Sequence, residues 1–275
     1  IPTNVSAPSL PYGMESPKIE KEADFWTIFP SLIFAFVIAI SLLILLSKFK
    51  AEFLLKLWFF VVIIIALGIS LNAPLSFFEY SSLIAFLIAV PLAWEKIYRR
   101  NLVVHNVTEL LVYPGIAAVF VPILNIWTII ILLILISIYD MWAVWHSGIM
   151  QKMAKYQIQK LNIFSGFFVP YASRKVMDKI KDMKKNLSKR QLEKKKIRVN
   201  VAILGGGDVV FPIIAAGVML RSFGFIPVLF VIIGATLGLS YLFFFAEKRK
   251  FYPAMPYISA GIFTGMLISW LVSLI

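Results

Sequence analysis

Long apolar blocks separated by short polar connections dominate this 275-residue chain. Most of these blocks approach the roughly 20 residues that a helix needs to cross about 30 Å of hydrocarbon. Strands in lipid must close into a barrel of weakly alternating segments, so continuous apolar blocks favour helices. With 60% hydrophobic residues, the chain also has too little polar surface for a water-soluble domain. The sequence therefore predicts an all-α, polytopic transmembrane helical bundle.

The apolar blocks predict eight membrane-spanning helices. Their ranges are 25–47, 53–71, 80–97, 104–121, 124–145, 199–220, 226–246 and 254–275. The third and fourth are the weakest, because each contains a proline and the fourth also contains Glu109. The spans divide the chain into an extracytoplasmic loop (1–24), N-terminal helices (25–147), a long loop (148–198) and C-terminal helices (199–275).

Positive charge is distributed unevenly between the connections. If the predicted spans alternate across the membrane, all but three of the 27 Lys and Arg residues fall on one side, and the exceptions are Lys18, Lys21 and Arg221. The positive-inside rule assigns the richer side to the cytoplasm. We therefore expect a multi-pass cell-membrane protein with loop 148–198 in the cytoplasm and the C-terminus outside. The net charge of +13 is then a signal of topology and does not indicate nucleic-acid binding.

Three acidic residues, Glu109, Asp140 and Asp208, lie well inside predicted spans. A carboxylate at the bilayer centre costs about 2.5–3.5 kcal/mol on insertion scales. No basic residue lies deep in a predicted span to pair with them, so a structural ion pair is a poor explanation. We interpret Glu109 as a polar packing contact, with gating or proton relay as the alternative. His105 and His146, near span ends, are interpreted as interfacial residues.

Asp140 and Asp208 flank the same long loop. Asp140 lies six residues before His146 and Asp208 ten residues after Arg198. On helices, these offsets correspond to about 9 and 15 Å from the cytoplasmic ends, so two antiparallel spans could bring the carboxyl groups together. Two facing carboxyl groups in a low-dielectric site share a proton. The ionised group can activate water while the protonated group donates to a carbonyl, which hydrolyses an amide without a covalent intermediate.

Three glycines, Gly205, Gly206 and Gly207, directly precede Asp208. Together they cost a helix about 2–3 kcal/mol relative to alanine. One interpretation is a loosened helix whose backbone lets a substrate chain approach closely. The other is small-residue helix packing, which is common in membranes. The residues alone leave both open.

Three short motifs occur in order on separate predicted spans. They are Tyr139-Asp140, the Gly-x-Gly-Asp run that ends at Asp208, and Pro253-Ala254-Met255. Together they resemble the Tyr-Asp, G-x-G-D and Pro-Ala-Leu motifs of the presenilin and signal peptide peptidase family, and the compact chain looks most like its archaeal presenilin homologues. The resemblance implies a nine-span intramembrane aspartyl protease with Asp140 and Asp208 as catalytic residues. No metal or other cofactor is expected.

The resemblance also implies a substrate-binding role for Pro253, Ala254 and Met255, because the family's Pro-Ala-Leu segment lies near the active site. Met255 replaces the family's leucine, which is a volume-conserving change. Eight spans are visible instead of nine, so we expect that the first is missing and that 1–24 is the external loop after it. We also expect the substrate to unwind and pair as a strand with backbone near 253–256 and with part of the loop before Arg198.

Orientation separates the two branches of the family, because presenilins place the loop between the catalytic spans in the cytosol. The lysine distribution therefore favours the presenilin branch, and substrates resembling single-span proteins with an external N-terminus. The sequence does not indicate which accessory subunits, if any, take part. The rival class is a cation- or proton-coupled transporter or leak channel, which would also use membrane-embedded carboxylates. A catalytically dead scaffold leaves both aspartates unexplained.

Other protease chemistries lack support in the sequence. The chain has no cysteine, no His-Glu-x-x-His motif for zinc and no Gly-x-Ser-Gly motif for a serine nucleophile. Two G-x-x-x-G pairs, Gly234/Gly238 and Gly261/Gly265, predict close helix contacts within one subunit.

Overall fold

The computed structural model describes residues 11–14, 19, 21–49, 51–99, 101–147, 165–171, 200–245 and 252–273. The helices are α1 (Glu22–Lys48), α2 (Glu52–Leu75), α3 (Ser81–Tyr98), α4 (Leu102–Phe120), α5 (Ile126–Trp142), α9 (Gly207–Phe223), α10 (Phe225–Phe245) and α11 (Met255–Val272). A 3-10 turn, Val121–Ile123, joins α4 to α5, and a π turn, Ala143–Ser147, extends α5. Two strands, β1 (Gly166–Tyr171) and β2 (Asn200–Gly205), pair antiparallel.

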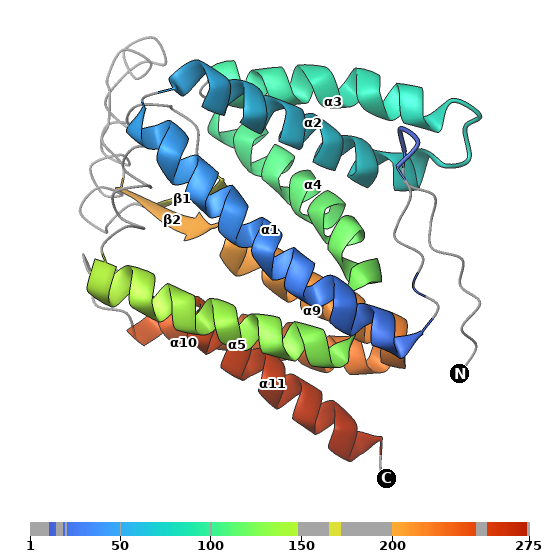
Figure 1. The fold of residues 1–275 in the computed structure, drawn as a ribbon, viewed down its shortest axis with the longest axis vertical. Helices are drawn as coiled ribbons and strands as arrows, with labels where there is room; N and C mark the ends of the chain where they lie inside the picture. Colours follow the sequence, from blue (N-terminus) through green and yellow to red (C-terminus); the bar gives the residue numbers. More distant parts are fainter. Residues whose placement is uncertain are drawn as a thin grey trace, which may run out of the picture.

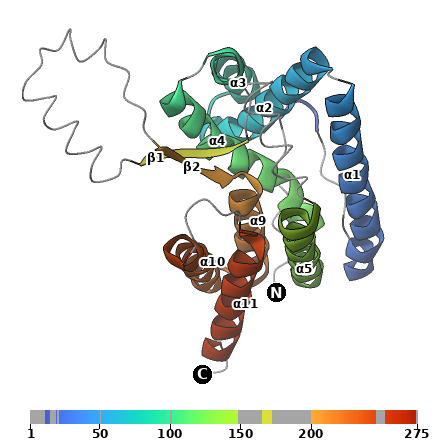
Figure 2. The ribbon, with the colours of Figure 1, turned by 90° about the vertical axis from the view of Figure 1, so that its left-hand side faces the viewer.

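The helices form two packed groups that meet at α4 and α9 (Figures 1 and 2). In one group α2 packs against α3 and α4, and in the other α10 and α11 pack against each other. The helix α5 contacts α11 and α9, whereas α1 crosses the front of the molecule with few contacts. The small sheet lies at the end of the bundle where α5 ends and α9 begins (Figure 1).

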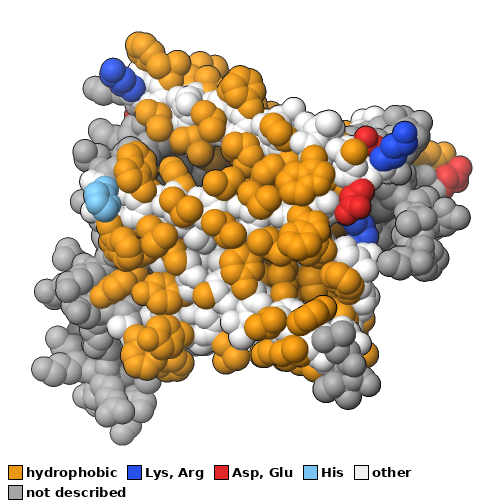
Figure 3. All heavy atoms as spheres, turned by 60° about the horizontal axis from the view of Figure 1, so that its bottom comes forward, with side chains coloured by type: hydrophobic (Ala, Val, Ile, Leu, Met, Phe, Trp, Pro, Cys, Tyr) orange, Lys and Arg blue, Asp and Glu red, His pale blue; other side chains and the backbone are white. Residues whose placement is uncertain are grey.

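The outer surface is that of a membrane protein. Seven helices in the described part of the chain, α1 to α5, α10 and α11, are long and apolar enough to cross a membrane. Hydrophobic side chains cover most of the face in Figure 3, and the charged side chains drawn there lie near its edges. The prediction of a polytopic helical bundle is confirmed. Most of the predicted extracytoplasmic loop 1–24 and most of loop 148–198 lie outside the described residues, and α1 begins at Glu22, within the range predicted as loop.

The predicted sixth span, 199–220, is wrong in its first third. Residues Asn200–Gly205 form β2, and α9 begins only at Gly207. A short apolar run bounded by glycine fits a strand as well as a helix, and its pairing partner, β1, is too distant in sequence to predict. Asp208 therefore lies in the first turn of α9, and its predicted depth of about 15 Å along a continuous helix does not apply.

Glycines allow α10 and α11 to approach closely, as the two G-x-x-x-G pairs predicted. A Cβ atom on Gly234 would lie 2.1 Å from the carbonyl oxygen of Gly261, and a Cβ on Gly265 would lie 2.3 Å from that of Phe230. A side chain at either position would push the helices apart. The start of α11, which carries Met255, is thus held in place partly through this packing.

Candidate active site

Asp140 projects from the last turn of α5. It is 7% exposed, although it lies in a helix made almost entirely of apolar residues. One carboxylate oxygen, Oδ2, accepts a hydrogen bond of 3.0 Å from the backbone N–H of Met255, and the backbone of Ala254 also interacts with it. The start of α11 therefore holds this carboxyl group in position.

Asp208 follows the turn that joins β2 to α9. Gly206 precedes the first helical residue, and its carbonyl accepts from the N–H groups of Val209 and Val210 at 3.2 and 2.9 Å. An acidic residue in the first turn of a helix is stabilised by the helix dipole. The backbone N–H of Gly205 interacts with the Asp208 carboxylate, and a Cβ on Gly205 would lie 3.0 Å from Oδ2. Glycine thus lets the carboxylate fold back onto its own turn.

The two aspartates face one cavity and interact electrostatically. The cavity has a volume of about 810 Å³, and its walls come from α1, α2, α5, the glycine turn and the start of α11. The walls from α1 and α2 are mainly leucine, isoleucine and other apolar side chains. The acidic side chains in the lining are Asp140 and Asp208. A predominantly apolar segment could therefore lie in the cavity with its backbone beside both aspartates.

The remaining predicted site residues are distributed around this cavity. Tyr139 is 45% exposed, lines the cavity and packs its ring 6.4 Å from that of Trp142. Met255 also lines it, while Pro253 and Ala254 are buried and are not among its lining residues, although the backbone of Ala254 interacts with Asp140. Of the predicted substrate-binding segment, only Met255 therefore reaches the cavity directly.

The glycines preceding Asp208 have different surroundings. Gly205, Gly206 and Gly207 all line the cavity, and Gly207 is exposed to it. A Cβ on Gly206 would lie 2.9 Å from Ser165 Oγ and 3.0 Å from Tyr113 Oη, whereas one on Gly207 would meet only Phe211 at 3.6 Å. Gly206 is therefore required for packing, and Gly207 leaves space on the cavity side. Gly205 and Gly206 lie before α9, so the run is a strand-to-helix turn and not part of a continuous helix, and close approach of a substrate chain at Gly207 stays a prediction.

The interpretation of Glu109 as a polar packing contact is confirmed, but the expectation that no basic residue could reach it is wrong. Lys96, which the predicted spans placed at the membrane boundary, is buried in α3 and its Nζ lies 2.5 Å from Glu109 Oε1. Removing one partner of such a buried pair typically costs about 3–5 kcal/mol. His105, predicted to be interfacial, lies in the first turn of α4 and is buried against the sheet, whereas His146 is exposed.

Sequence reasoning missed several polar residues around the aspartates. Ser137, one turn before Asp140, donates to Ser259 of α11 at 2.9 Å, and both serines are buried. A polar residue three positions from Asp140 in an apolar helix was a usable signal for this contact. Ser165, which lines the cavity, could not be found, because nothing in the sequence places it beside Gly206. No group of three or more His, Asp or Glu side chains within the described ranges is arranged to hold a metal ion.

A family model described as "Signal-peptide peptidase, presenilin aspartyl protease" matches residues 10–275. The chain belongs to this family. This presenilin-family protein has a fold similar to two solved structures described as a presenilin family intramembrane aspartate protease, in the C222 and P2 space groups. The first has a TM-score of 0.58 at 19% identity and covers 95% of this chain and 89% of its own. The second has a TM-score of 0.57 at 19% identity and covers 90% and 83%. Comparison with curated proteins gives no significant match.

Family membership establishes the activity. The protein is an intramembrane aspartyl protease, a hydrolase that acts on transmembrane substrates in the bilayer. The alternative of a transporter or leak channel is not supported.

Proposed function

We propose that Asp140 and Asp208 are the catalytic pair of this protease. The observation that carries the proposal is that two carboxyl groups from different helices face one largely apolar cavity and interact electrostatically. In such a site one carboxylate takes a proton from the attacking water, while the protonated partner donates to the scissile carbonyl. No covalent intermediate is needed. The motif residues Tyr139, Gly205, Gly206 and Gly207 shape the surroundings of the pair.

The test is cleavage of a single-span substrate by the purified protein in detergent or liposomes, with products identified by mass spectrometry. Asp140→Asn and Asp208→Asn are each expected to lower kcat by about 10²–10⁴-fold, because each removes one proton-transfer group. Asp24→Asn is the matched control, since Asp24 lies in the first turn of α1 and does not line the cavity. Normal cleavage by either active-site variant would refute the assignment.

The substrate is proposed to be the membrane-spanning helix of a single-span protein. A transmembrane helix satisfies its own backbone hydrogen bonds, so a turn must unwind before water can attack a peptide carbonyl. The exposed backbone then needs new partners, and addition to a strand edge provides them. Backbone near 253–256, together with the sheet formed by β1 and β2, lies close enough to the aspartates to serve.

A crosslinking scan tests this placement of the substrate. Photoreactive groups introduced at Met255 and along β2 should both capture a bound, uncleaved substrate in the Asp208→Asn background. A crosslinker on α10 at Leu237 is the control, because that side chain is exposed and is not among the residues that line the cavity. Capture of substrate only at the control position would contradict the proposal.

We also propose that loop 148–198 faces the cytoplasm and that the C-terminus lies outside, as the charge distribution predicts. The chain contains no cysteine, so single cysteines can be introduced without background labelling. In intact cells, an impermeant thiol reagent should label a cysteine replacing Ser273 and should not label one placed in the loop. The opposite pattern would invert the topology and assign the substrates the opposite orientation.

A further inference from the structure

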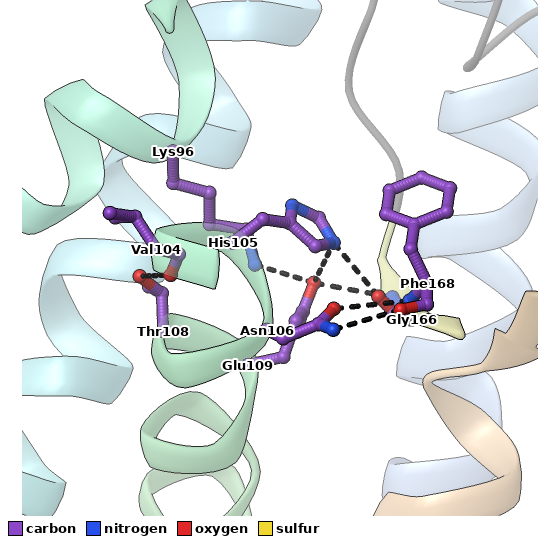
Figure 4. Close-up of polar contacts among 8 residues, drawn as sticks. All are labelled: Lys96, Val104, His105, Asn106, Thr108, Glu109, Gly166 and Phe168. Carbon is purple, nitrogen blue, oxygen red and sulfur yellow. Dashed lines mark hydrogen bonds and ion pairs between the residues drawn. The ribbon is translucent and has the colours of Figure 1, made fainter. Parts of the chain in front are cut away.

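Three side chains of α4 bind the backbone of strand β1 (Figure 4). Asn106 uses both ends of its amide on one residue: Nδ2 donates to the carbonyl of Phe168 at 2.9 Å, and Oδ1 accepts from the N–H of Phe168 at 3.1 Å. These are the two bonds that a neighbouring strand would make. The Asn106 side chain therefore occupies the outer edge of β1 in place of a third strand.

The same face of α4 also binds the first residue of β1. The carbonyl of Gly166 lies 2.8 Å from Nε2 of His105, which donates to it, and the N–H of Gly166 donates to Oε1 of Glu109 at 3.2 Å. His105 and Glu109 are four residues apart and lie on one face of the helix. The His105 ring also packs 4.8 Å from that of Phe168. Lys96 balances the buried charge of Glu109 from α3. We call His105, Asn106, Glu109 and Lys96 the α4 clamp.

The clamp determines which edge of the sheet remains for other partners. In an antiparallel strand, the N–H and C=O of one residue point to the same side, and successive residues alternate. The backbone N–H and C=O groups of residues 166 and 168 point toward α4. Those of residues 167 and 169 therefore point toward β2, where the register pairs these residues with Leu204 and Ala202. Pro170 lacks an N–H and falls on the side facing away from β2, where no ladder bond is lost.

The clamp is connected to Asp208 through the paired strands. The register places Gly166 opposite Gly205, and the N–H of Gly206 donates to the carbonyl of Ser165, just before β1, at 3.1 Å. Gly205 and Gly206 form the turn that carries Asp208, and the Gly205 N–H interacts with its carboxylate. The path from α4 to the carboxylate therefore runs through backbone hydrogen bonds, so a displacement of β1 would also displace the turn that carries Asp208.

We propose that the α4 clamp positions Asp208 for catalysis. The clamp holds β1, and through β1 it holds β2 and the glycine turn, in a fixed position relative to Asp140. This inference rests on Asp208 being catalytic. Glu109 contributes through its acceptor oxygen on the Gly166 N–H, and Lys96 through keeping that oxygen's buried charge compensated. The clamp residues are not among the residues that line the cavity, so they act through the sheet rather than by touching the substrate.

Two double variants separate the acceptor from the charge. Lys96→Met with Glu109→Gln removes both charges but keeps an amide oxygen for the Gly166 N–H. Lys96→Met with Glu109→Leu removes both charges and the acceptor at similar volume. Thr108→Val is the matched control, because Thr108 is buried in the same helix and its hydroxyl bonds only the Val104 carbonyl (Figure 4).

The readouts are kcat, KM and the melting temperature of each purified variant. We expect Thr108→Val and the Gln-containing double variant to keep kcat within about threefold of the wild type. The Leu-containing double variant should have a kcat at least about tenfold lower, since misplacing a reacting group by about 1 Å can cost about 10²-fold in rate. Its KM should change by less than about threefold, because the apolar cavity walls from α1 and α2 are untouched.

Three results would overturn the proposal: a wild-type kcat in the Leu-containing variant, an equal loss in both double variants, or a raised KM at unchanged kcat. If the Leu-containing variant does not fold, Asn106→Leu decides by the same criteria, because it introduces no unpaired charge. Asp208→Asn is measured in parallel. Cleavage by Asp208→Asn would refute the proposed catalytic pair, whereas its inactivity alongside a fully active Leu-containing variant would refute only the clamp.

Discussion

Gly238 of α10 lies directly against the first turn of α11, and replacing it with alanine tests how the active site depends on helix packing. A Cβ on Gly238 would lie 2.3 Å from the carbonyl oxygen of Tyr257 and 3.0 Å from its carbonyl carbon. Cβ atoms essentially never approach other heavy atoms within 3.0 Å, so α10 and the first turn of α11 must separate locally by at least about 0.7 Å. Both contacted atoms are backbone, so no side-chain rotation can relieve the overlap.

This displacement acts two residues from Met255, whose N–H donates to Asp140 at 3.0 Å. A shift of about 0.7 Å along that bond in either direction takes it outside the usual 2.7–3.2 Å range. Misplacement by about 1 Å can cost about 10²-fold in rate, so we expect kcat to fall by about 10- to 10²-fold. Alanine is a better helix former than glycine by about 1 kcal/mol, so helix propensity alone would predict no loss.

The assay is cleavage of a single-span substrate, with thermal unfolding measured on the same preparation. Leu237→Phe is the control, because it adds a larger side chain at the neighbouring position of α10, where the side chain is 64% exposed. The control should behave as the wild type in both measurements. If Gly238→Ala keeps wild-type kcat, the contact between α10 and α11 does not position Asp140, and the reasoning fails.

Three further predictions concern other contacts. Gly206→Ala should lower the free energy of unfolding by about 1–3 kcal/mol through overpacking. Gly207→Ala, with open space on the cavity side, should leave the melting temperature unchanged and raise KM. Equal melting temperatures for the two variants would contradict this prediction. Ser137→Ala and Ser259→Ala should show a coupling energy of about 0.6 kcal/mol in a double-mutant cycle, and additive effects would show that the hydrogen bond contributes nothing. Arg221→Ala should destabilise the protein by about 1 kcal/mol, because the Arg221 guanidinium binds three carbonyls of the α4–α5 turn. Arg221→Lys should keep only part of the stability that Arg221→Ala loses, and full wild-type stability with lysine would show that charge alone matters.

The membrane-spanning helices were predictable because burial in hydrocarbon is a local requirement. A span needs about 20 apolar residues whatever surrounds it, so seven of the eight predicted spans correspond to helices long and apolar enough to cross. The aspartates were predictable for the same reason, because a carboxyl group in an apolar run stands out without any knowledge of its neighbours. The G-x-x-x-G spacing of the glycines in α10 and α11 likewise predicted that these helices pack closely.

The sheet and the α4 clamp were not predictable in this way. The pairing of Gly166 with Gly205 joins segments 39 positions apart, and neither strand has a pattern that excludes a helix. Lys96 lies at the end of the predicted span 80–97, and its charge indicated the membrane boundary, yet Glu109 on another helix compensates that charge inside the protein. Such pairings depend on which side chains the tertiary structure brings together.

The sequence by itself thus determined that this protein lies in a membrane, where most of its spans are, and which two carboxyl groups we propose as catalytic, because each follows from the cost of placing one residue type in lipid. Only the tertiary structure decided that Asp140 and Asp208 face one cavity, that Met255 holds the first, and that α4 anchors the sheet leading to the second. These are contacts between distant segments, and their free energies depend on three-dimensional neighbours that no local pattern specifies.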